Sequence, residues 1–163
     1  MSFEYFIKEA RAKYDSYNEE WIRAYFDEKS GGFNVYHKDH KFSKTGGGGE
    51  AEKKVGELLA KYNSKQIEFL PENDKSPDIK FDNQTWDIKY INNANEETVR
   101  KYIADAAKAD NAIFYYEKIT QYQVLRSAII RETGKYLKRG KISELPDIYH
   151  IKDGLLKVLW KKN

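Results

Sequence analysis

Two aspartates and a lysine, Asp78, Asp87 and Lys89, have residue types and spacing that suit metal-assisted chemistry on a phosphodiester. They lie in two short β-prone runs joined by Asp82-Asn83, and Asp and Asn tolerate the left-handed backbone that a two-residue hairpin turn requires. Such a turn pairs Asp78 with Asp87 across the strands, with Cβ atoms roughly 5 Å apart. Like charges so placed repel, and a divalent cation between them relieves the repulsion, since Mg²⁺ is typically held by one or two carboxylates plus phosphate and water.

Lys89 should share the strand face of Asp87, because side chains alternate across a strand and the two residues lie about 6.5 Å apart along it. The opposite face then takes the apolar residues of the two runs, Ile79, Trp86, Ile88 and Tyr90. A longer turn is the alternative, because Lys80 and Thr85 suit only an edge or the end of a hairpin. A solvated strand face is the alternative to a site, because Asp-x-Lys is common in strands.

The order and spacing of four segments are more specific than Asp-x-Lys alone. These segments are Gly46–Leu59, Ile67–Pro71, Ser76–Lys80 and Trp86–Lys89. From about Gly46 to its C-terminus the chain resembles the C-terminal tRNase domain of contact-dependent growth inhibition toxins, which belongs to the PD-(D/E)xK nuclease superfamily. The resemblance implies that Asp78 and Asp87 bind Mg²⁺ or Mn²⁺, that Glu50 is the helix glutamate completing the metal site, and that Lys89 is the catalytic lysine.

The activity that this resemblance implies is a metal-dependent endoribonuclease of the toxin type, with tRNA as the favoured nucleic acid. It also implies a cognate immunity protein as partner and the cytoplasm as the site of action, reached by delivery into a target cell. Two departures from the family pattern are an aspartate, Asp87, in place of the usual glutamate, and the loop 92–95, Asn-Asn-Ala-Asn. A DNA endonuclease of the same superfamily is the first alternative. A non-catalytic phage structural or interaction module is the second, since residues 31–40 are similar to a stretch in phage head-morphogenesis proteins.

Composition narrows the classes of function. The chain has 163 residues and no cysteine, which excludes thiol catalysis and thiolate metal sites. Its formal net charge is only +3 although 34% of its residues are charged, so bulk charge does not indicate nucleic-acid binding. No apolar run approaches the length of a membrane span. A local basic cluster is more suggestive of phosphate contacts, although basic residues at a helix end also complement its dipole; its members are Lys135, Lys138, Arg139 and Lys141.

Two further motifs carry less weight. Residues 46–49 are four glycines without the lysine and serine or threonine of a phosphate-binding loop, so a linker is the favoured interpretation. His37 and His40 form His-x-x-His after a strand-like run. They are candidates for general acid or base catalysis on a ribose hydroxyl, with a surface or core-edge role as the alternative.

The hydrophobic pattern predicts an α/β fold with a central mixed sheet flanked by helices, like the PD-(D/E)xK core. Apolar residues at helical spacing predict two helices in a helical N-terminal subregion, 1–32, the second of them over Trp21–Phe26. A nuclease-like α/β domain is expected over 33–163. Within it the pattern predicts strands and helices in alternation, ending in a hairpin at Asp153-Gly154.

Overall fold

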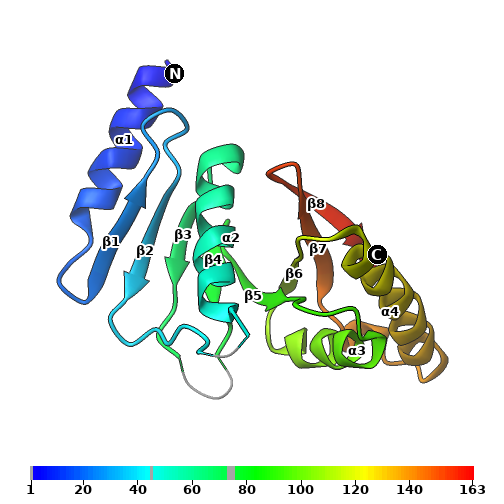
Figure 1. The fold of residues 1–163 in the computed structure, drawn as a ribbon. Coiled ribbons are helices and arrows are strands. Elements are labelled where there is room, and N and C mark those ends of the chain that lie inside the picture. Colours follow the sequence, from blue (N-terminus) through cyan, green and yellow to red (C-terminus); the bar gives the residue numbers. More distant parts are fainter. Residues whose placement is uncertain (1, 45, 73–75) are drawn as a thin grey trace.

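The computed structural model describes residues 2–44, 46–72 and 76–163. In these residues the strands form one mixed sheet of eight, and their order in the sheet is their order in the chain (Figure 1). The strands are β1 (Trp21–Phe26), β2 (Phe33–His37), β3 (Gln66–Phe69), β4 (Ile79–Phe81), β5 (Gln84–Tyr90), β6 (Asn111–Tyr115), β7 (Asp147–Lys152) and β8 (Leu155–Trp160). Three neighbouring pairs are parallel, β2 with β3, β5 with β6 and β6 with β7, and the others are antiparallel. The predicted α/β class with a mixed sheet is confirmed.

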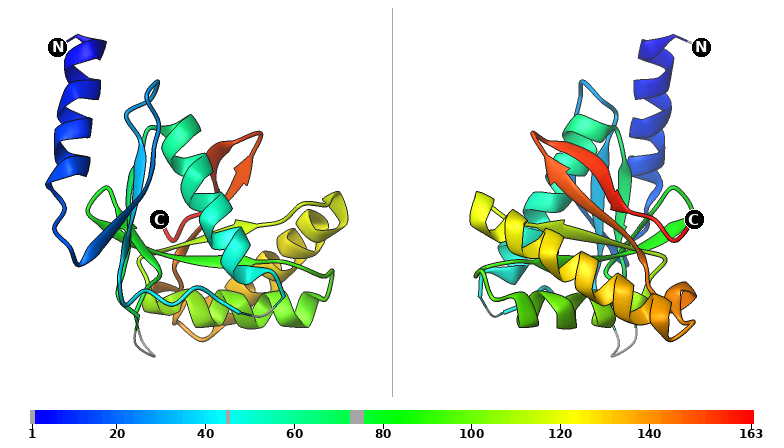
Figure 2. Two further views of the ribbon diagram at one scale, coloured as in Figure 1. Left: turned by 60° about the vertical axis from the view of Figure 1, so that its left-hand side comes forward. Right: turned by 90° about the vertical axis from the view of Figure 1, so that its right-hand side faces the viewer.

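Helices cover both faces of this sheet. They are α1 (Phe3–Ser16), α2 (Gly48–Asn63), α3 (Glu96–Asp105) and α4 (Ile119–Lys138), with short 3₁₀ helices η1 (Ala106–Lys108) and η2 (Ile142–Glu144). α2 lies over one face, while α3 and α4 pack together at the other end of the molecule from α1 (Figures 1 and 2). None of the described helices is long and apolar enough to cross a membrane.

Two hydrophobic clusters hold the layers together, one on each face of the central strands. The cluster under α2 contains Val55 and Leu59 with the strand residues Trp86 and Ile88. The cluster under α3 and α4 contains the remaining central strand residues together with helical ones, including Val99, Ile103, Ala112, Phe114 and Leu125. Alternation along β5 therefore places Trp86 and Ile88 toward α2 and leaves Asp87 and Lys89 on the α3 side.

The prediction of a second helix over Trp21–Phe26 is wrong, because this segment is the edge strand β1. β1 pairs antiparallel with β2, and the register shifts by one residue between Arg23 and Tyr25. Such a bulge turns residues an odd number apart toward the same face. Trp21 and Phe26, five residues apart, accordingly both pack on the cluster of Tyr14, Phe33 and Val35, although a regular strand would turn them to opposite faces. The expected helical subregion 1–32 is thus one helix plus a strand of the common sheet.

Candidate metal and phosphate site

The predicted two-residue turn is present between β4 and β5. Asp82 and Asn83 both have left-handed backbone, with φ of 52° and 58°. The ladder pairs Phe81 with Gln84 and ends where Ile79 faces Trp86. β4 stops there, and Asp78 and Asp87 lie just beyond this last pair, where their side chains come together at the same cavity.

Asp78 is fixed by hydrogen bonds from its own backbone and side chain. Its N–H donates to the Trp86 carbonyl at 3.1 Å, and its Oδ2 accepts the N–H of Ile88 at 2.7 Å. The side chain thereby replaces the missing β4 carbonyl beyond the end of the ladder. Asp78 is only 8% exposed and Asp87 is fully buried, at 0%. The hairpin therefore holds two carboxyl groups together out of water.

This placement perturbs the protonation of the pair. Burial is the main cause that raises the pKa of Asp78 to about 9, followed by the close side-chain interaction with Asp87 and the negative charge on that residue. Glu52 adds to the rise, and the N–H of Ile88 opposes it. At neutral pH and without a cation, Asp78 therefore keeps its proton.

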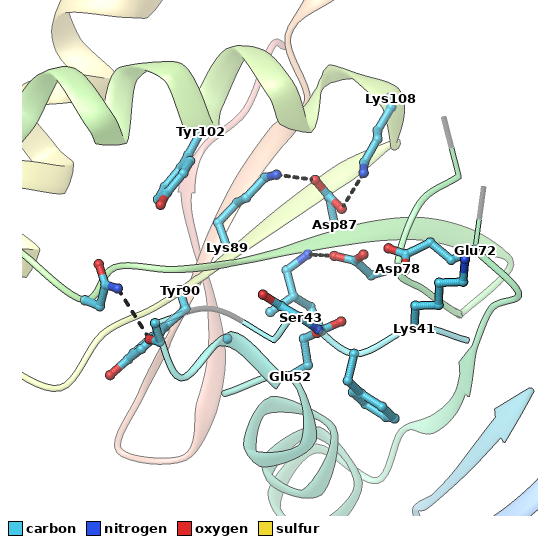
Figure 3. A pocket seen from close by; sticks show the side chains of 15 residues that line it. Lys41, Ser43, Glu52, Glu72, Asp78, Asp87, Lys89, Tyr90, Tyr102 and Lys108 are labelled. Atoms are coloured by element: carbon cyan, nitrogen blue, oxygen red, sulfur yellow. Dashed lines mark hydrogen bonds and ion pairs between the residues drawn. The ribbon is translucent and has the colours of Figure 1, made fainter. Parts of the chain in front are cut away.

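Two lysines contact the buried carboxylate of Asp87 from different elements. Lys89 Nζ lies 3.1 Å from Asp87 Oδ2, and Lys108 Nζ lies 3.5 Å from Oδ1 (Figure 3). Neither contact has hydrogen-bond geometry, so both Asp87 oxygens lack a hydrogen-bond partner among the described residues. Figure 3 shows Lys89 on the side of β5 that faces Tyr102 of α3, as the alternation along the strand predicted.

These groups line a cavity of about 430 Å³ between α3, β5 and the segment before α2. Its charged lining is rich in both signs: the carboxylates are Glu52, Glu72, Asp78 and Asp87, and the lysines are Lys41, Lys89 and Lys108. Tyr90, Asn92 and Tyr102 form part of the remaining wall. A cavity with this lining has groups to bind a cation and groups to bind an anion side by side.

The structure does not bring Glu50 to the carboxylate pair. Its side chain is 88% exposed and lies 3.9 Å from Lys53 on the same helix. Glu52, two residues on, faces inward, is 6% exposed and lines the cavity. Positions two apart on a helix differ by about 200° in direction, so only one of these glutamates can face the sheet. The helix glutamate beside the aspartates is therefore Glu52 in place of the predicted Glu50.

Glu52 positions the segment that leads into α2. Its Oε2 accepts the N–H of Ser43 at 2.9 Å, and its Oε1 lies 3.4 Å from His40 Nε2. His40 Nδ1 lies 2.7 Å from the carbonyl oxygen of Leu70, which can only accept a hydrogen bond. Leu70 in turn donates its N–H to the Asp78 carbonyl at 2.9 Å. One chain of contacts thus connects α2 to Asp78.

The two histidines predicted as acid or base candidates do not line the cavity. His40 is buried, with a side-chain exposure of 0%. Burial lowers the pKa of His40, but hydrogen bonds to Glu52 and Leu70 outweigh it and leave the pKa raised. His37 packs edge-on against Trp21 and accepts the N–H of Asp39 at 3.1 Å. The positions of both side chains indicate structural roles.

The predicted basic cluster lies on another surface. Lys135, Lys138 and Arg139 line a shallow depression on α4 that Arg100 and Arg131 also border. None of these residues, and not Lys141, lines the cavity with Asp78 and Asp87. They are exposed to solvent and present several positive charges. This surface is a second place where phosphates could be contacted, and it is separate from the carboxylate pair.

The donors of the cavity suit a hard divalent cation. Both oxygens of the buried Asp87 lack hydrogen bonds among the described residues, and Asp78 uses Oδ2 for Ile88. No group of three or more His, Cys, Asp or Glu side chains in the described ranges is arranged to hold a metal. Two carboxylates with room for water and phosphate are nevertheless a typical Mg²⁺ donor set.

Sequence reasoning missed Lys108 and Glu52, and for different reasons. Lys108 lies 21 positions after Asp87, so no short motif joins them. The helical pattern does indicate the direction of Glu52, because Ala51, Val55 and Leu59 define the buried stripe of α2 and Glu52 lies beside that stripe.

Comparisons of the chain with models of protein families, with curated proteins and with solved structures found no match.

Proposed function

We propose that this protein is a metal-dependent endoribonuclease, with tRNA as its favoured substrate and with Mg²⁺ or Mn²⁺ as its cofactor. The observation that supports it best is that the buried carboxyl groups of Asp78 and Asp87 lie together beside Lys89 in a polar cavity. A buried pair of like-charged groups costs stability unless a cation or a proton offsets it. A structural role alone gives no reason to place both carboxylates and two lysines in one cavity.

In this proposal Asp78 and Asp87 hold the cation through carboxylate oxygens. A divalent cation bound there supplies Lewis-acid stabilisation of the charge that develops on a phosphoryl oxygen. Lys89, whose side chain is 18% exposed to the cavity, donates hydrogen bonds to the attacking water or to a phosphate oxygen. Glu52 keeps the Ser43 backbone in place at the wall of the cavity. Hydrolysis joins the water oxygen to phosphorus and breaks the bond to the leaving nucleoside oxygen.

The choice of RNA, and of tRNA in particular, depends on the resemblance of residues 46–163 to the toxin tRNase domain. A carboxylate pair with a lysine is indifferent to the sugar, and a DNA endonuclease uses the same groups. A toxin-type nuclease also acts in the cytoplasm of its target cell and has a cognate immunity protein, and both belong to the proposal on the same grounds.

The test is cleavage of total tRNA, total RNA, plasmid and single-stranded DNA by the purified protein, with Mg²⁺, with Mn²⁺ and with excess EDTA. We expect metal-dependent cleavage of tRNA, abolished in Asp78→Ala and Asp87→Ala and reduced at least about 100-fold in Lys89→Ala. Lys80→Ala is the matched control, because Lys80 is exposed on the same hairpin and does not line the cavity. Cleavage of plasmid alone would favour the DNA enzyme, and cleavage undiminished by EDTA would overturn the metal mechanism.

A further inference from the structure

We infer that Lys108 is a second lysine of the cavity that binds phosphate. Its ammonium group weakens the binding of a divalent metal ion at Asp87 and strengthens the binding of the nucleic-acid phosphate. This inference rests on the proposed function and adds to it a substrate contact outside the Asp-x-Lys strand. It concerns a residue from η1, an element that packs against β5 and β6 but shares no sequence motif with them.

The first support is the position of the Lys108 ammonium group. It lies 3.5 Å from Asp87 Oδ1, whereas Lys89 lies 3.1 Å from Oδ2. The two ammonium groups therefore flank one carboxylate, and both residues line the cavity. The Lys108 side chain is 30% exposed while that of Asp87 is 1% exposed, so the lysine is the partner that reaches the open side.

The second support is the rigidity of the backbone that carries Lys108. Ala106 is fully buried and Ala109 is 9% exposed, so both flanks of the lysine are anchored in the core. The next residue, Asp110, is tied to the start of β5 because its Oδ2 accepts the N–H and the hydroxyl of Thr85 at 3.0 and 3.1 Å. The Asp110 N–H donates back to the Thr85 hydroxyl at 3.1 Å. These bonds fix η1 relative to the strand that carries Asp87.

The third support is the balance of charge around Asp87. One carboxylate contacts two ammonium groups, which is one more positive charge than an ion pair needs. An ammonium group that is accessible, on a residue whose backbone is anchored on both sides, is suited to contact phosphate as a point charge. When Asp87 instead binds a divalent cation, both lysines are free to contact the phosphodiester, and each phosphate contact strengthens nucleic-acid binding.

Lys108 should therefore change the affinities for the metal ion and for RNA in opposite directions. Its charge repels a divalent cation from Asp87, so its removal should strengthen cation binding. Its charge attracts phosphate, so its removal should weaken RNA binding. A lysine that only stabilised the fold would not move the two affinities in opposite directions.

The experiment compares the wild-type protein with Lys108→Ala, Lys108→Arg and the control Lys101→Ala. Lys101 is exposed on α3 and does not line the cavity, so its removal changes the net charge equally. Mn²⁺ affinity is measured by calorimetry without RNA. RNA affinity is measured by the fluorescence anisotropy of a labelled single-stranded oligonucleotide in Mg²⁺, across a salt series, and cleavage of tRNA is followed by kcat and KM.

In Lys108→Ala we expect Mn²⁺ to bind on the order of tenfold more tightly. RNA binding should weaken on the order of tenfold, with a salt slope about one unit shallower, and the loss of kcat/KM should appear mainly in KM. Lys108→Arg should keep most of the wild-type RNA affinity, and Lys101→Ala should match the wild type in Mn²⁺ affinity and KM. Unchanged or weaker Mn²⁺ binding in Lys108→Ala would overturn the inference, as would unchanged RNA affinity.

The two proposals fail separately in this design. If the wild-type protein cleaves no nucleic acid, the proposed function fails, while Mn²⁺ calorimetry and RNA anisotropy still decide the role of Lys108. If the protein cleaves RNA and Lys108→Ala retains wild-type affinities and KM, the function stands and the inference about Lys108 is wrong. Unfolding curves of each variant identify any loss that comes from an unfolded sample.

Discussion

The burial of Asp78 beside Asp87 predicts that, in the absence of metal, the free energy of unfolding falls as pH rises. Because the pKa of Asp78 is raised to about 9 in the folded protein, the folded state keeps a proton that the unfolded chain, with an ordinary pKa near about 3.9, has already lost. Unfolding then releases this proton, so the free energy of unfolding falls as pH rises through this window. The Asp78→Asn variant has no such proton, and its amide can keep both the contact to Ile88 and the one to Asp87.

The magnitude follows from the number of protons released. One proton held only in the folded state changes the free energy of unfolding by up to about 1.4 kcal/mol per pH unit. The experiment is urea unfolding in EDTA at several values between about pH 5 and about pH 8. Over this range the free energy of unfolding of Asp78→Asn should rise relative to that of the wild type by up to about 4 kcal/mol. The pKa of His40 is also raised, so its contribution to stability falls as pH rises, but His40 is present in both proteins and its contribution cancels in the difference.

Two controls sharpen this experiment. Asp105→Asn removes an exposed charge at the end of α3 and should give a profile parallel to the wild type. Mg²⁺ at about 100 times its dissociation constant should raise the free energy of unfolding of the wild type by about 2.7 kcal/mol at the higher pH. It should raise that of Asp78→Asn only slightly. A constant difference in the free energy of unfolding between wild type and Asp78→Asn, from about pH 5 to about pH 8, would refute the claim that folded Asp78 keeps a proton.

Two other predictions test the surroundings of the pair. Glu52→Gln should destabilise the fold by about 1 to 3 kcal/mol because the charged contacts to His40 and Ser43 are weakened. The exposed Glu50→Gln should stay within about 0.5 kcal/mol of the wild type in thermal unfolding, and equal losses would reject the assignment of Glu52. The double variant Lys138→Ala, Arg139→Ala should flatten the salt dependence of RNA affinity by up to about two units at an unchanged saturated cleavage rate. A normal salt slope would remove the depression on α4 from the nucleic-acid interface.

The parts of the site that the sequence predicted are those determined by local geometry. Asp82 and Asn83 specify a two-residue turn, and a turn of known length fixes which residues face each other in a hairpin. The face of Lys89 follows from alternation alone. The two aspartates come together as expected, although Asp78 lies beyond the last pair of the ladder and donates its N–H to Trp86. The hairpin at Asp153-Gly154 is correct for the same reason, since both residues have positive φ.

The parts that the sequence did not predict depend on tertiary contacts or on irregular backbone. The bulge near Arg23 puts Trp21 and Phe26 on one face of β1, which breaks the alternation by which a strand is recognised in a sequence. Lys108 reaches Asp87 only because η1 is tied to β5 through Asp110 and Thr85. The inward direction of Glu52 depends on which side of α2 meets the sheet, and the exact start of a helix after four glycines is weakly specified by periodicity.

The location of the cavity follows from where the sheet stops pairing. β4 is only three residues long, so the edge of β5 from Asp87 onward has no β4 residues beside it. Asp78 reaches this free edge with a side-chain bond to the N–H of Ile88, and the segment before α2 lines the cavity beside the rest. The opposite face of the same hairpin is packed with Ile79 and Trp86 in the core, which offsets the cost of holding two carboxyl groups out of water. A longer β4 would satisfy the backbone of β5 by itself and leave neither the open edge nor the paired carboxylates. The break in the ladder therefore creates, in one place, the unsatisfied oxygen atoms and the space that a cation and a phosphate require.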